Sequence, residues 1–389
     1  MENFDDIRPY NDSEVASVVQ NLIKNKEFIN SISIFQLPKL KKNAPFLANF
    51  LIKKELKKRL ININSIGEFQ NQVSVYVRGI LDKSSNGVKV EGLNKLSPEK
   101  GYLFVSNHRD IAMDPALIGY LLHQAKLRTV EIAIGDNLLK KDFVSDLMRL
   151  NKSFIVKRSA IGREKLVATK KLSQYIHFAI ESGNNVWIAQ KEGRAKDGLD
   201  KTDPTIIKMF HMAKREASSD DKKMDLKEAI DNLHIIPVSI SYEYDPCDEM
   251  KARELFEIEK NGTFKKDKNS DIKSISTGIE GFKGKIQVNF GNEIIAKESD
   301  AALIANQLDE QIISNYKLFP SNYLAYEILQ KQNPELGLSL EDLNLNLSEI
   351  NSKRVEFNAR LNNFEEELKP YILKMYANPV FRKLDFYKS

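Results

Sequence analysis

The stretch LFVSNHRDIAMDP, residues 103–115, places a histidine just after a predicted buried strand. Its first part, Leu103-Phe104-Val105, is a short apolar run bounded by polar residues, which is typical of a core strand. Asp114 and Pro115 precede another apolar run, and that order is typical of a helix N-cap and first helical residue. His108 therefore lies in a predicted strand-to-helix connection, where the scaffold fixes the backbone while side chains stay accessible.

A histidine with an acidic neighbour carries useful chemistry at this position. The carboxylate fixes the tautomer of the ring and stabilises the imidazolium, so the histidine can take a proton from an alcohol near neutral pH. Such a pair suits acyl transfer to a hydroxyl group. The same residues also permit a structural interpretation, in which His108 caps a backbone carbonyl and Asp114 only caps a helix.

Strands and helices alternate on both sides of this stretch. The predicted strands cover residues 87–93, 102–106, 129–134, 153–157, 185–190, 234–241 and 285–290. Predicted helices cover residues 115–125, 138–149, 162–182 and 204–216. This alternation predicts an α/β fold with a largely parallel, helix-covered sheet, and places the active-site loops together at one edge of that sheet.

Helices are predicted at both ends of the chain, so we expect three regions. Residues 1–83 form an N-terminal helical region with helices at 13–35, 45–60 and 67–81, residues 84–296 form the α/β domain, and residues 297–389 form a C-terminal helical extension. A long helical pattern over 341–375 covers the core or mediates contacts in a homodimer. Two charged inserts, 214–227 and 257–273, are predicted to be solvated excursions.

The composition narrows the class of protein. The 389 residues are 42% hydrophobic and 9% aromatic, which is ordinary for a chain that buries a sizeable core. Cys247 is the single cysteine, which excludes an intramolecular disulfide and favours a reducing compartment. The start has no signal-peptide pattern, and no apolar stretch reaches the roughly 18 residues of a membrane-spanning helix. We therefore expect a cytoplasmic protein, soluble or peripherally associated with the inner face of a membrane.

A net charge of +5 suits anionic partners, and the basic residues gather in one predicted helix. In residues 46–60, phenylalanines and leucines repeat at helical spacing and lysines are expected to fill the other side. Such a helix can lie on an anionic membrane surface, or it can pack on the core with a solvated basic face. A nucleic-acid partner is not expected, because the lysines lack interleaved aromatic residues and no nucleic-acid module is present.

Cations also follow two predicted strands. Lys157 and Arg158 end one strand, and the sequence KEGRAKDG, residues 191–198, follows the next. Arginine presents forked donors that match phosphate oxygens, and glycine allows close backbone approach. Two basic strand ends beside His108 would make an anion pocket, although each basic run alone is also typical of a solvated loop.

Four segments in order carry a family resemblance: Asn107-His108 with a downstream aspartate, Phe154–Arg158, Glu192-Gly193-Arg194 and Ile235–Val238. Together they resemble the blocks of the glycerolipid acyltransferases, which include the glycerol-3-phosphate and lysophosphatidic acid acyltransferases. The resemblance covers roughly residues 88–294. It implies direct transfer of a fatty acyl group from an acyl-CoA or acyl-carrier-protein thioester to a hydroxyl of a phosphate-bearing lipid acceptor, with no metal, no other cofactor and no acyl-enzyme.

The resemblance also implies roles for individual residues. His108 matches the general base and Asp114 the aspartate that orients it. The candidate substrate-binding residues are Asn107, Lys157, Arg158, Glu192, Gly193, Arg194, Lys196 and Pro237, of which Pro237 matches the proline of the fourth block, with a structural or acyl-donor role.

Two departures from the family pattern leave alternatives open. The family usually places four residues between the histidine and the aspartate, whereas five separate His108 from Asp114, so the loop bulges or Asp110 takes the role. In the third block Lys191 replaces the usual proline and the usual threonine is missing. The acceptor is therefore open, with a lyso-aminoacyl lipid as the alternative. A noncatalytic lipid-binding protein on the same fold is a third interpretation.

Overall fold

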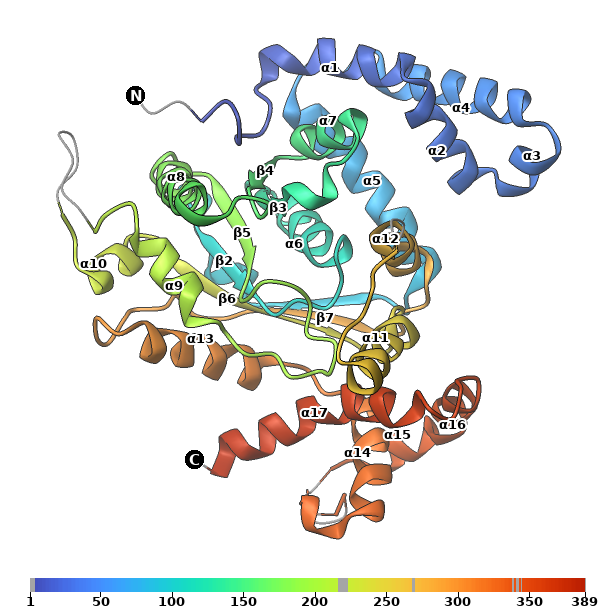
Figure 1. Cartoon of the computed structure of the whole chain (residues 1–389), viewed down its shortest axis with the longest axis vertical. Coiled ribbons are helices and arrows are strands. Elements are labelled where there is room, and N and C mark those ends of the chain that lie inside the picture. The colour runs from blue at the N-terminus through green and yellow to red at the C-terminus, as the bar shows by residue number, and fades with distance from the viewer. Residues whose placement is uncertain are drawn as a thin grey trace. The chain divides into compact units, whose positions relative to one another are not determined.

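The computed structural model describes residues 4–215, 223–267, 270–337, 339–340, 343 and 345–388 (Figure 1). The chain divides into two compact units. The first takes in the chain up to Arg78 together with Val130–Tyr175. The second takes in Gly79–Thr129 and the chain from Ile176 onward, so it contains the stretch around His108.

The second unit is built on five strands: β1 (Val88–Glu91), β2 (Leu103–Ser106), β5 (Asn185–Ala189), β6 (Ile235–Tyr242) and β7 (Ile286–Phe290). Their order is β1-β7-β6-β2-β5, and every neighbouring pair is parallel except β6 with β7. All residues of β2 and β6 are buried, which explains why their sequences are largely apolar. The predicted α/β fold with a largely parallel sheet is confirmed.

Helices pack around these strands in the second unit. They are α6 (Met113–Gln124), α9 (Pro204–His211), α10 (Leu226–Asp231), α11 (Asp248–Asn261), α12 (Ser270–Glu280), α13 (Ala301–Asn315), α14 (Pro320–Gln332), α15 (Leu347–Ser352), α16 (Arg354–Asn362) and α17 (Lys369–Lys388). Two longer helices, α5 (Ile66–Ser84) and α8 (Gly162–Glu181), begin in the first unit and end in the second.

Two expectations for this part of the chain were wrong in detail. The pattern over 341–375 does not form one long helix, because the chain turns between α16 and α17 and Pro370 occupies the first turn of α17, where proline is tolerated. The insert at 257–273 is also shorter than expected, since α11 continues to Asn261 and α12 begins at Ser270. Half of the insert at 214–227, residues 216–222, lies outside the described residues.

The C-terminal helices share a hydrophobic core with the end of β6 and with α11. Tyr244 and Ala252 pack with residues of α14, α16 and α17, including Tyr326, Phe357 and Tyr376. This packing explains why residues 297–388 belong to the same compact unit as the sheet.

The first unit contains a parallel pair of strands, β3 (Val130–Gly135) and β4 (Ser153–Val156), with α7 (Asp142–Leu150) between them in sequence. Four further helices precede them: α1 (Asp12–Lys24), α2 (Lys26–Gln36), α3 (Pro38–Asn43) and α4 (Pro45–Leu60). The predicted helix over 13–35 is two helices, because the side chain of Asn25 accepts a hydrogen bond from the backbone of Phe28 and caps α2.

The faces of α4 differ from the expected pattern. Its buried residues are Ala48 and Ile52, whereas Phe46 and Phe50 are 90% and 63% exposed. Since residues at i, i+4, i+7 and i+11 fall on one side of a helix, the stripe of Phe46 and Phe50 continues into Lys53 and Lys57. Apolar and basic residues therefore occupy the same exposed face, at its N-terminal and C-terminal halves, rather than opposite faces.

Candidate active site

The end of β2 and the start of α6 place His108 and Asp114 in contact. His108 Nδ1 lies 2.9 Å from Asp114 Oδ2. The side chain of Asp114 is fully buried and that of His108 is 14% exposed. The ring is therefore oriented from one side while it remains open to solvent on another.

The carboxylate of Asp114 accepts three further hydrogen bonds. Its Oδ2 accepts from the backbone N–H groups of Arg109 at 2.6 Å and Asp110 at 2.9 Å. Its Oδ1 accepts from the hydroxyl of Tyr242 at 2.8 Å. Asp114 also lies in the first turn of α6, where the helix dipole favours a negative charge. These contacts fix the carboxylate in one orientation.

Asp110 makes different contacts. Its Oδ1 accepts from the backbone N–H groups of Ala112 at 2.9 Å and Met113 at 2.8 Å, so it supports the turn that leads into α6. Burial, and next the neighbouring Asp114, raise the pKa of Asp110. Of the two aspartates left open by the sequence, Asp114 is the one that contacts His108, and the turn before α6 accommodates the additional residue.

Trp187 borders the ring of His108 on another side. The two rings meet edge to face with centroids 5.7 Å apart, and the Trp187 indole N–H donates to Ser106 Oγ at 2.9 Å. His108 Nε2 makes no hydrogen bond with any residue that the structure describes. With Nδ1–H assigned to Asp114 from the hydrogen-bond geometry, Nε2 is the free acceptor that a general base needs.

Two of the predicted substrate-binding residues are buried in the sheet. The amide of Asn107 accepts from Ile240 N at 2.8 Å and donates to Ile240 O at 2.9 Å, which ties the chain after β2 to β6. Pro237 is buried within β6, and its carbonyl accepts from Gly291 N at 2.8 Å. This geometry favours a structural contribution from both residues.

The connection from β2 into the first turn of α6, residues 107–114, is called the histidine loop below. The segment that follows β5 lies beside it. Ala195 N donates to His108 O at 3.2 Å, while Glu192 and Gly193 are exposed. Arg194 Nη1 donates to Ser274 Oγ of α12 at 2.7 Å, and Lys196 pairs with Glu254 of α11 at 2.6 Å. The structure therefore brings the predicted third-block residues next to His108.

Lys157 and Arg158 belong to the first unit and follow β4. Both are exposed. Lys157 Nζ lies 2.8 Å from Asp6 Oδ2, and the backbone N–H of Arg158 donates to Asp136 Oδ1 at 3.1 Å. The structure places these cations at the end of a strand, as the sequence predicted, and groups the other candidate residues in the second unit.

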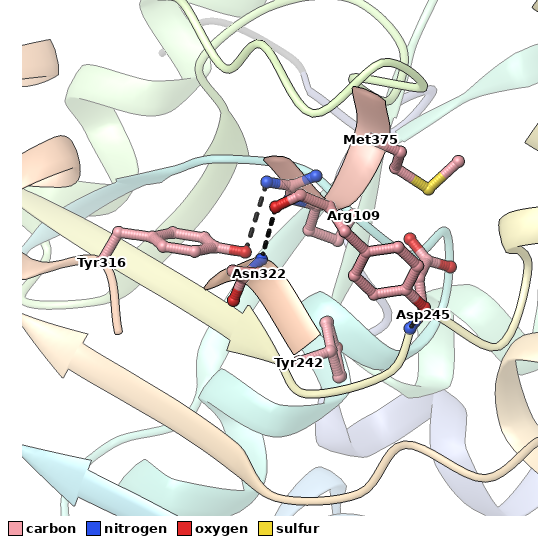
Figure 2. Close-up of a pocket in the computed structure, with 7 residues that line it drawn as sticks. Arg109, Tyr242, Asp245, Tyr316, Asn322 and Met375 are labelled. Carbon is pink, nitrogen blue, oxygen red and sulfur yellow. Dashed lines mark hydrogen bonds between the residues drawn. The ribbon is translucent and has the colours of Figure 1, made fainter. Parts of the chain in front are cut away.

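A buried polar cluster lies behind the histidine loop. Arg109 pairs with Asp200 at 2.9 Å, and its guanidinium also donates to the hydroxyl of Tyr316 at 3.3 Å. Burial opposes the charge of Arg109, but Asp200 next to it keeps its pKa raised. Figure 2 shows Arg109 and Tyr316 at a small pocket that Tyr242, Asp245, Asn322, Met375 and Tyr376 also line.

The sequence of residues 87–241 matches the protein-family model described as Acyltransferase. The chain carries an acyltransferase domain. The match begins just before β1, ends within β6 and contains His108, Asp114 and Arg194. It confirms the family resemblance of the four blocks.

Several chains of solved structures are similar to this chain. One is the 1-acyl-sn-glycerophosphate (LPA) acyltransferase, PlsC, from Thermotoga maritima, with 13% identity and a TM-score of 0.38 over 77% of this chain and 93% of that chain. No curated protein sequence matches the chain.

Sequence reasoning missed Tyr242 as a contact of Asp114. This contact follows from strand order, because β2 and β6 are parallel neighbours and the carboxyl ends of such strands meet at one edge of a sheet, and the sequence alone does not give that order. Lys251 was also missed: it is buried in α11, and its Nζ donates to Arg109 O at 2.7 Å and pairs with Asp245. A lysine in a charged helix gives no sequence signal of such burial.

Neither a metal cluster nor a membrane-spanning helix is found in the described part of the chain. No group of three or more His, Cys, Asp or Glu side chains there has the arrangement of a metal site. No described helix is both long enough and apolar enough to cross a bilayer.

Proposed function

We propose that the acyltransferase domain moves a fatty acyl group from an acyl-CoA or acyl-carrier-protein thioester to a hydroxyl of lysophosphatidic acid or glycerol-3-phosphate. The hydrogen bond between His108 Nδ1 and Asp114 Oδ2 carries this proposal, because it leaves Nε2 unengaged at a partly exposed position. In this role His108 is the general base and Asp114 orients it.

The reaction moves one proton twice: from the acceptor hydroxyl to His108, and then from His108 to the leaving thiolate. His108 Nε2 takes the proton of the acceptor hydroxyl while the hydroxyl oxygen bonds to the thioester carbonyl carbon. The C–S bond then breaks, and the leaving thiolate receives the proton from the imidazolium. A thioester is already activated, so the protein mainly orients the alcohol and removes its proton, and general-base help supplies about 100- to 10,000-fold.

Cationic side chains near His108 support a phosphate on the acceptor. Arg194 and Lys196 lie on the segment whose backbone is bonded to His108, and Arg194 is only partly buried. Arginine and lysine bind phosphate oxygens through charge-assisted hydrogen bonds. A carboxylate headgroup, as in a lyso-aminoacyl lipid, would use the same donors, and Lys191 in place of the family's proline keeps that acceptor as the alternative.

The decisive experiment measures thiol release from acyl-CoA and from acyl-carrier protein with each acceptor: glycerol-3-phosphate, lysophosphatidic acid and a lyso-aminolipid. We expect acceptor-dependent release by the wild-type protein and its loss in His108→Ala. An unchanged circular dichroism spectrum of His108→Ala is the control for folding. Folded wild-type protein that releases no thiol with any pair would instead support a noncatalytic lipid-binding protein.

We also propose that α4 docks the protein on an anionic membrane surface. Phe46 is 90% and Phe50 is 63% exposed, and the exposed lysines follow on the same face of the helix. Exposed aromatic residues enter the headgroup region, and each lysine near an anionic surface contributes about 1 kcal/mol. The chemistry of the face therefore fits an acidic lipid surface.

A vesicle assay tests this docking. Glutamate replacements at Lys53, Lys54, Lys57 and Lys58 should abolish cosedimentation with anionic vesicles. The matched control carries the same replacements at four exposed lysines of the α11–α12 region, Lys260, Lys265, Lys266 and Lys273. Equal vesicle binding by the two variants would refute the role of α4.

A further inference from the structure

We infer that Tyr242 is a positioning residue for the proposed general base, acting through Asp114. This inference rests on the proposed function of His108. The hydroxyl of Tyr242 lies 2.8 Å from Asp114 Oδ1, on the opposite oxygen from the one that contacts His108. Tyr242 thus determines how the carboxylate is held and how much negative charge it presents to the ring.

The hydrogen bond from Tyr242 is important because Asp114 is buried. The side chain of Asp114 is fully buried, so water does not replace a missing donor. Its Oδ2 is shared by His108 and two backbone N–H groups. Among the described residues Oδ1 accepts from Tyr242 alone. Loss of the hydroxyl would therefore leave one carboxylate oxygen buried without a partner.

Tyr242 is suited to be a permanent donor. Burial, and next the charge of Asp114, raise the pKa of Tyr242 well above its usual value, so the phenol keeps its proton throughout the neutral range. Its backbone is fixed as well, since Tyr242 ends β6 and pairs in register with Ile286 of β7. A rigid, always protonated donor matches a carboxylate that must stay in one orientation.

Strand β6 holds the histidine loop at both of its ends. Before His108, the amide of Asn107 is bonded twice to the backbone of Ile240. After His108, Asp114 is bonded to Tyr242. These two anchors come from the same strand, two residues apart, so the position of His108 is set by β6 as well as by the strand that carries it.

Removing the Tyr242 hydroxyl has a predictable chemical effect. A donor on Oδ1 withdraws negative charge from the carboxylate. Without it, Asp114 attracts the imidazolium proton more strongly and is held through Oδ2 alone. We therefore expect Tyr242→Phe to lower kcat by roughly 10- to 100-fold, the usual cost of losing a group that orients a histidine ligand. The acid limb of the pH–rate profile should move to higher pH, and KM for both substrates should stay unchanged.

Tyr175→Phe is the matched control. The hydroxyl of Tyr175 donates to the buried carboxylate of Glu131 at 2.5 Å, so this variant also removes a buried phenol-to-carboxylate bond. Tyr175 belongs to the first unit, whereas His108 and Asp114 belong to the second. A general loss of packing would affect both variants, whereas only Tyr242→Phe should change kcat and the pH profile. Tyr242→Phe with wild-type kcat and an unchanged pH profile would overturn the inference.

A spectroscopic test does not depend on turnover. In protein labelled with ¹⁵N-histidine, the Nδ1–H proton of His108 is assigned by its loss in His108→Gln, a task made easier by the presence of only five histidines. We expect this resonance to move in Tyr242→Phe and to stay in place in Tyr175→Phe. An unmoved resonance refutes the positioning role, whether or not acyl transfer is detected. Activity retained by His108→Ala refutes the proposed function separately.

Discussion

Asp110 and Asp114 stand four residues apart, and their oxygens have different partners. Asp114 Oδ2 contacts His108, whereas Asp110 Oδ1 accepts from the backbone of Ala112 and Met113. We predict that Asp114→Asn lowers kcat by about 100- to 10,000-fold, the size of general-base assistance. Asp110→Asn should keep both capping bonds, because the amide oxygen still accepts, and should retain most activity. Steady-state kinetics of the two variants at one pH compares them directly.

Thermal unfolding separates capping from catalysis in the same pair. Asp110→Ala removes the acceptor for two backbone N–H groups, and a lost cap costs about 0.5–2 kcal/mol. We expect Asp110→Ala to unfold at a lower temperature than Asp110→Asn, with kcat closer to wild type than that of Asp114→Asn. Equal loss of kcat in Asp110→Asn and Asp114→Asn would show that both carboxylates serve the histidine.

Lys283 provides a prediction for pH-dependent stability. It is fully buried, and its Nζ donates to Ser84 Oγ, Ile279 O and Gly281 O. Burial lowers the pKa of Lys283 to about 8, although Asp110 and Cys247 raise it to a smaller extent. Between this value and the ordinary pKa of about 10.4, the unfolded chain holds a proton that the folded chain has released.

The contribution of Lys283 to stability therefore rises with pH in that window, and it is lost as the pH falls through about 8. We predict that the free energy of urea unfolding of the wild type, relative to Lys283→Met, increases between about pH 7.5 and about pH 10. The comparison with Lys283→Met cancels the other groups that titrate there. A difference that stays constant or shrinks with rising pH would contradict the prediction.

At the level of residues, the sequence predicted the contact between His108 and Asp114 but not the other side chains that hold it. The spacing of His108, Asp110 and Asp114 left two aspartates open, because a loop can bulge by one residue without any signal in the sequence. Tyr242 and Lys251 contact this loop from β6 and α11, which are more than 120 positions away in the chain. Such long-range contacts follow from strand order, and a single sequence does not contain strand order.

At the level of elements, α12 packs closely on the histidine loop through a glycine. A Cβ on Gly278 would overlap the carboxylate of Asp110, whereas a Cβ on Gly79 in α5 would meet no atom within 4 Å. We predict that Gly79→Ala stabilises the protein by about 1 kcal/mol through helix propensity. Gly278→Ala has the same propensity gain but should destabilise by about 1–3 kcal/mol, because overpacking displaces Asp110.

Urea unfolding measures the free energy of unfolding of Gly79→Ala and Gly278→Ala. Both glycines lie in helices, so the two variants differ in the space that is available to the added Cβ. Stabilisation by Gly278→Ala would show that α12 has room to move away from the loop. Lower stability in both variants would point instead to an effect of the substitution on the unfolded chain.

The strands were predicted more accurately than the helices, for a physical reason. Buried strands such as β2 and β6 have largely apolar sequences bounded by polar residues, and this pattern is local. The antiparallel pairing of β6 with β7 depends on the connection between them and has no local signal. In α4 the apolar repeat left a membrane-facing and a core-packed interpretation open, and the structure exposes Phe46 and Phe50 while it buries Ala48 and Ile52.

At the level of the whole molecule, the C-terminal helices complete the unit that contains the candidate site. Asn378 Nδ2 donates to Asp197 O at 2.7 Å, and Gly198 leaves space for the backbone of Met375. These contacts hold the end of the segment that carries Arg194. The sequence predicted a helical extension from residue 297, but its dependence on the sheet is visible only in the contacts between distant segments.

The same contacts predict the result of truncating the chain after residue 296. Arg360 pairs with the buried Asp248 at 2.6 Å, and the hydroxyl of Tyr376 donates to the same carboxylate at 2.9 Å. Truncation would leave Asp248 without these partners, and breaking a buried pair costs about 3–5 kcal/mol. It would also expose Tyr244 and Ala252, which pack in the C-terminal core.

A typical domain has only about 5–15 kcal/mol of stability in total, so we expect residues 1–296 not to fold cooperatively. Circular dichroism should show no sharp thermal transition for this fragment. Supplying residues 297–389 as a second chain is the control, because it restores the partners of Asp248 without the covalent link. A fragment that melts cooperatively near the temperature of the full chain would show that the α/β core is independent of its C-terminal helices, and that the positions of Arg194 and His108 are set within the core alone.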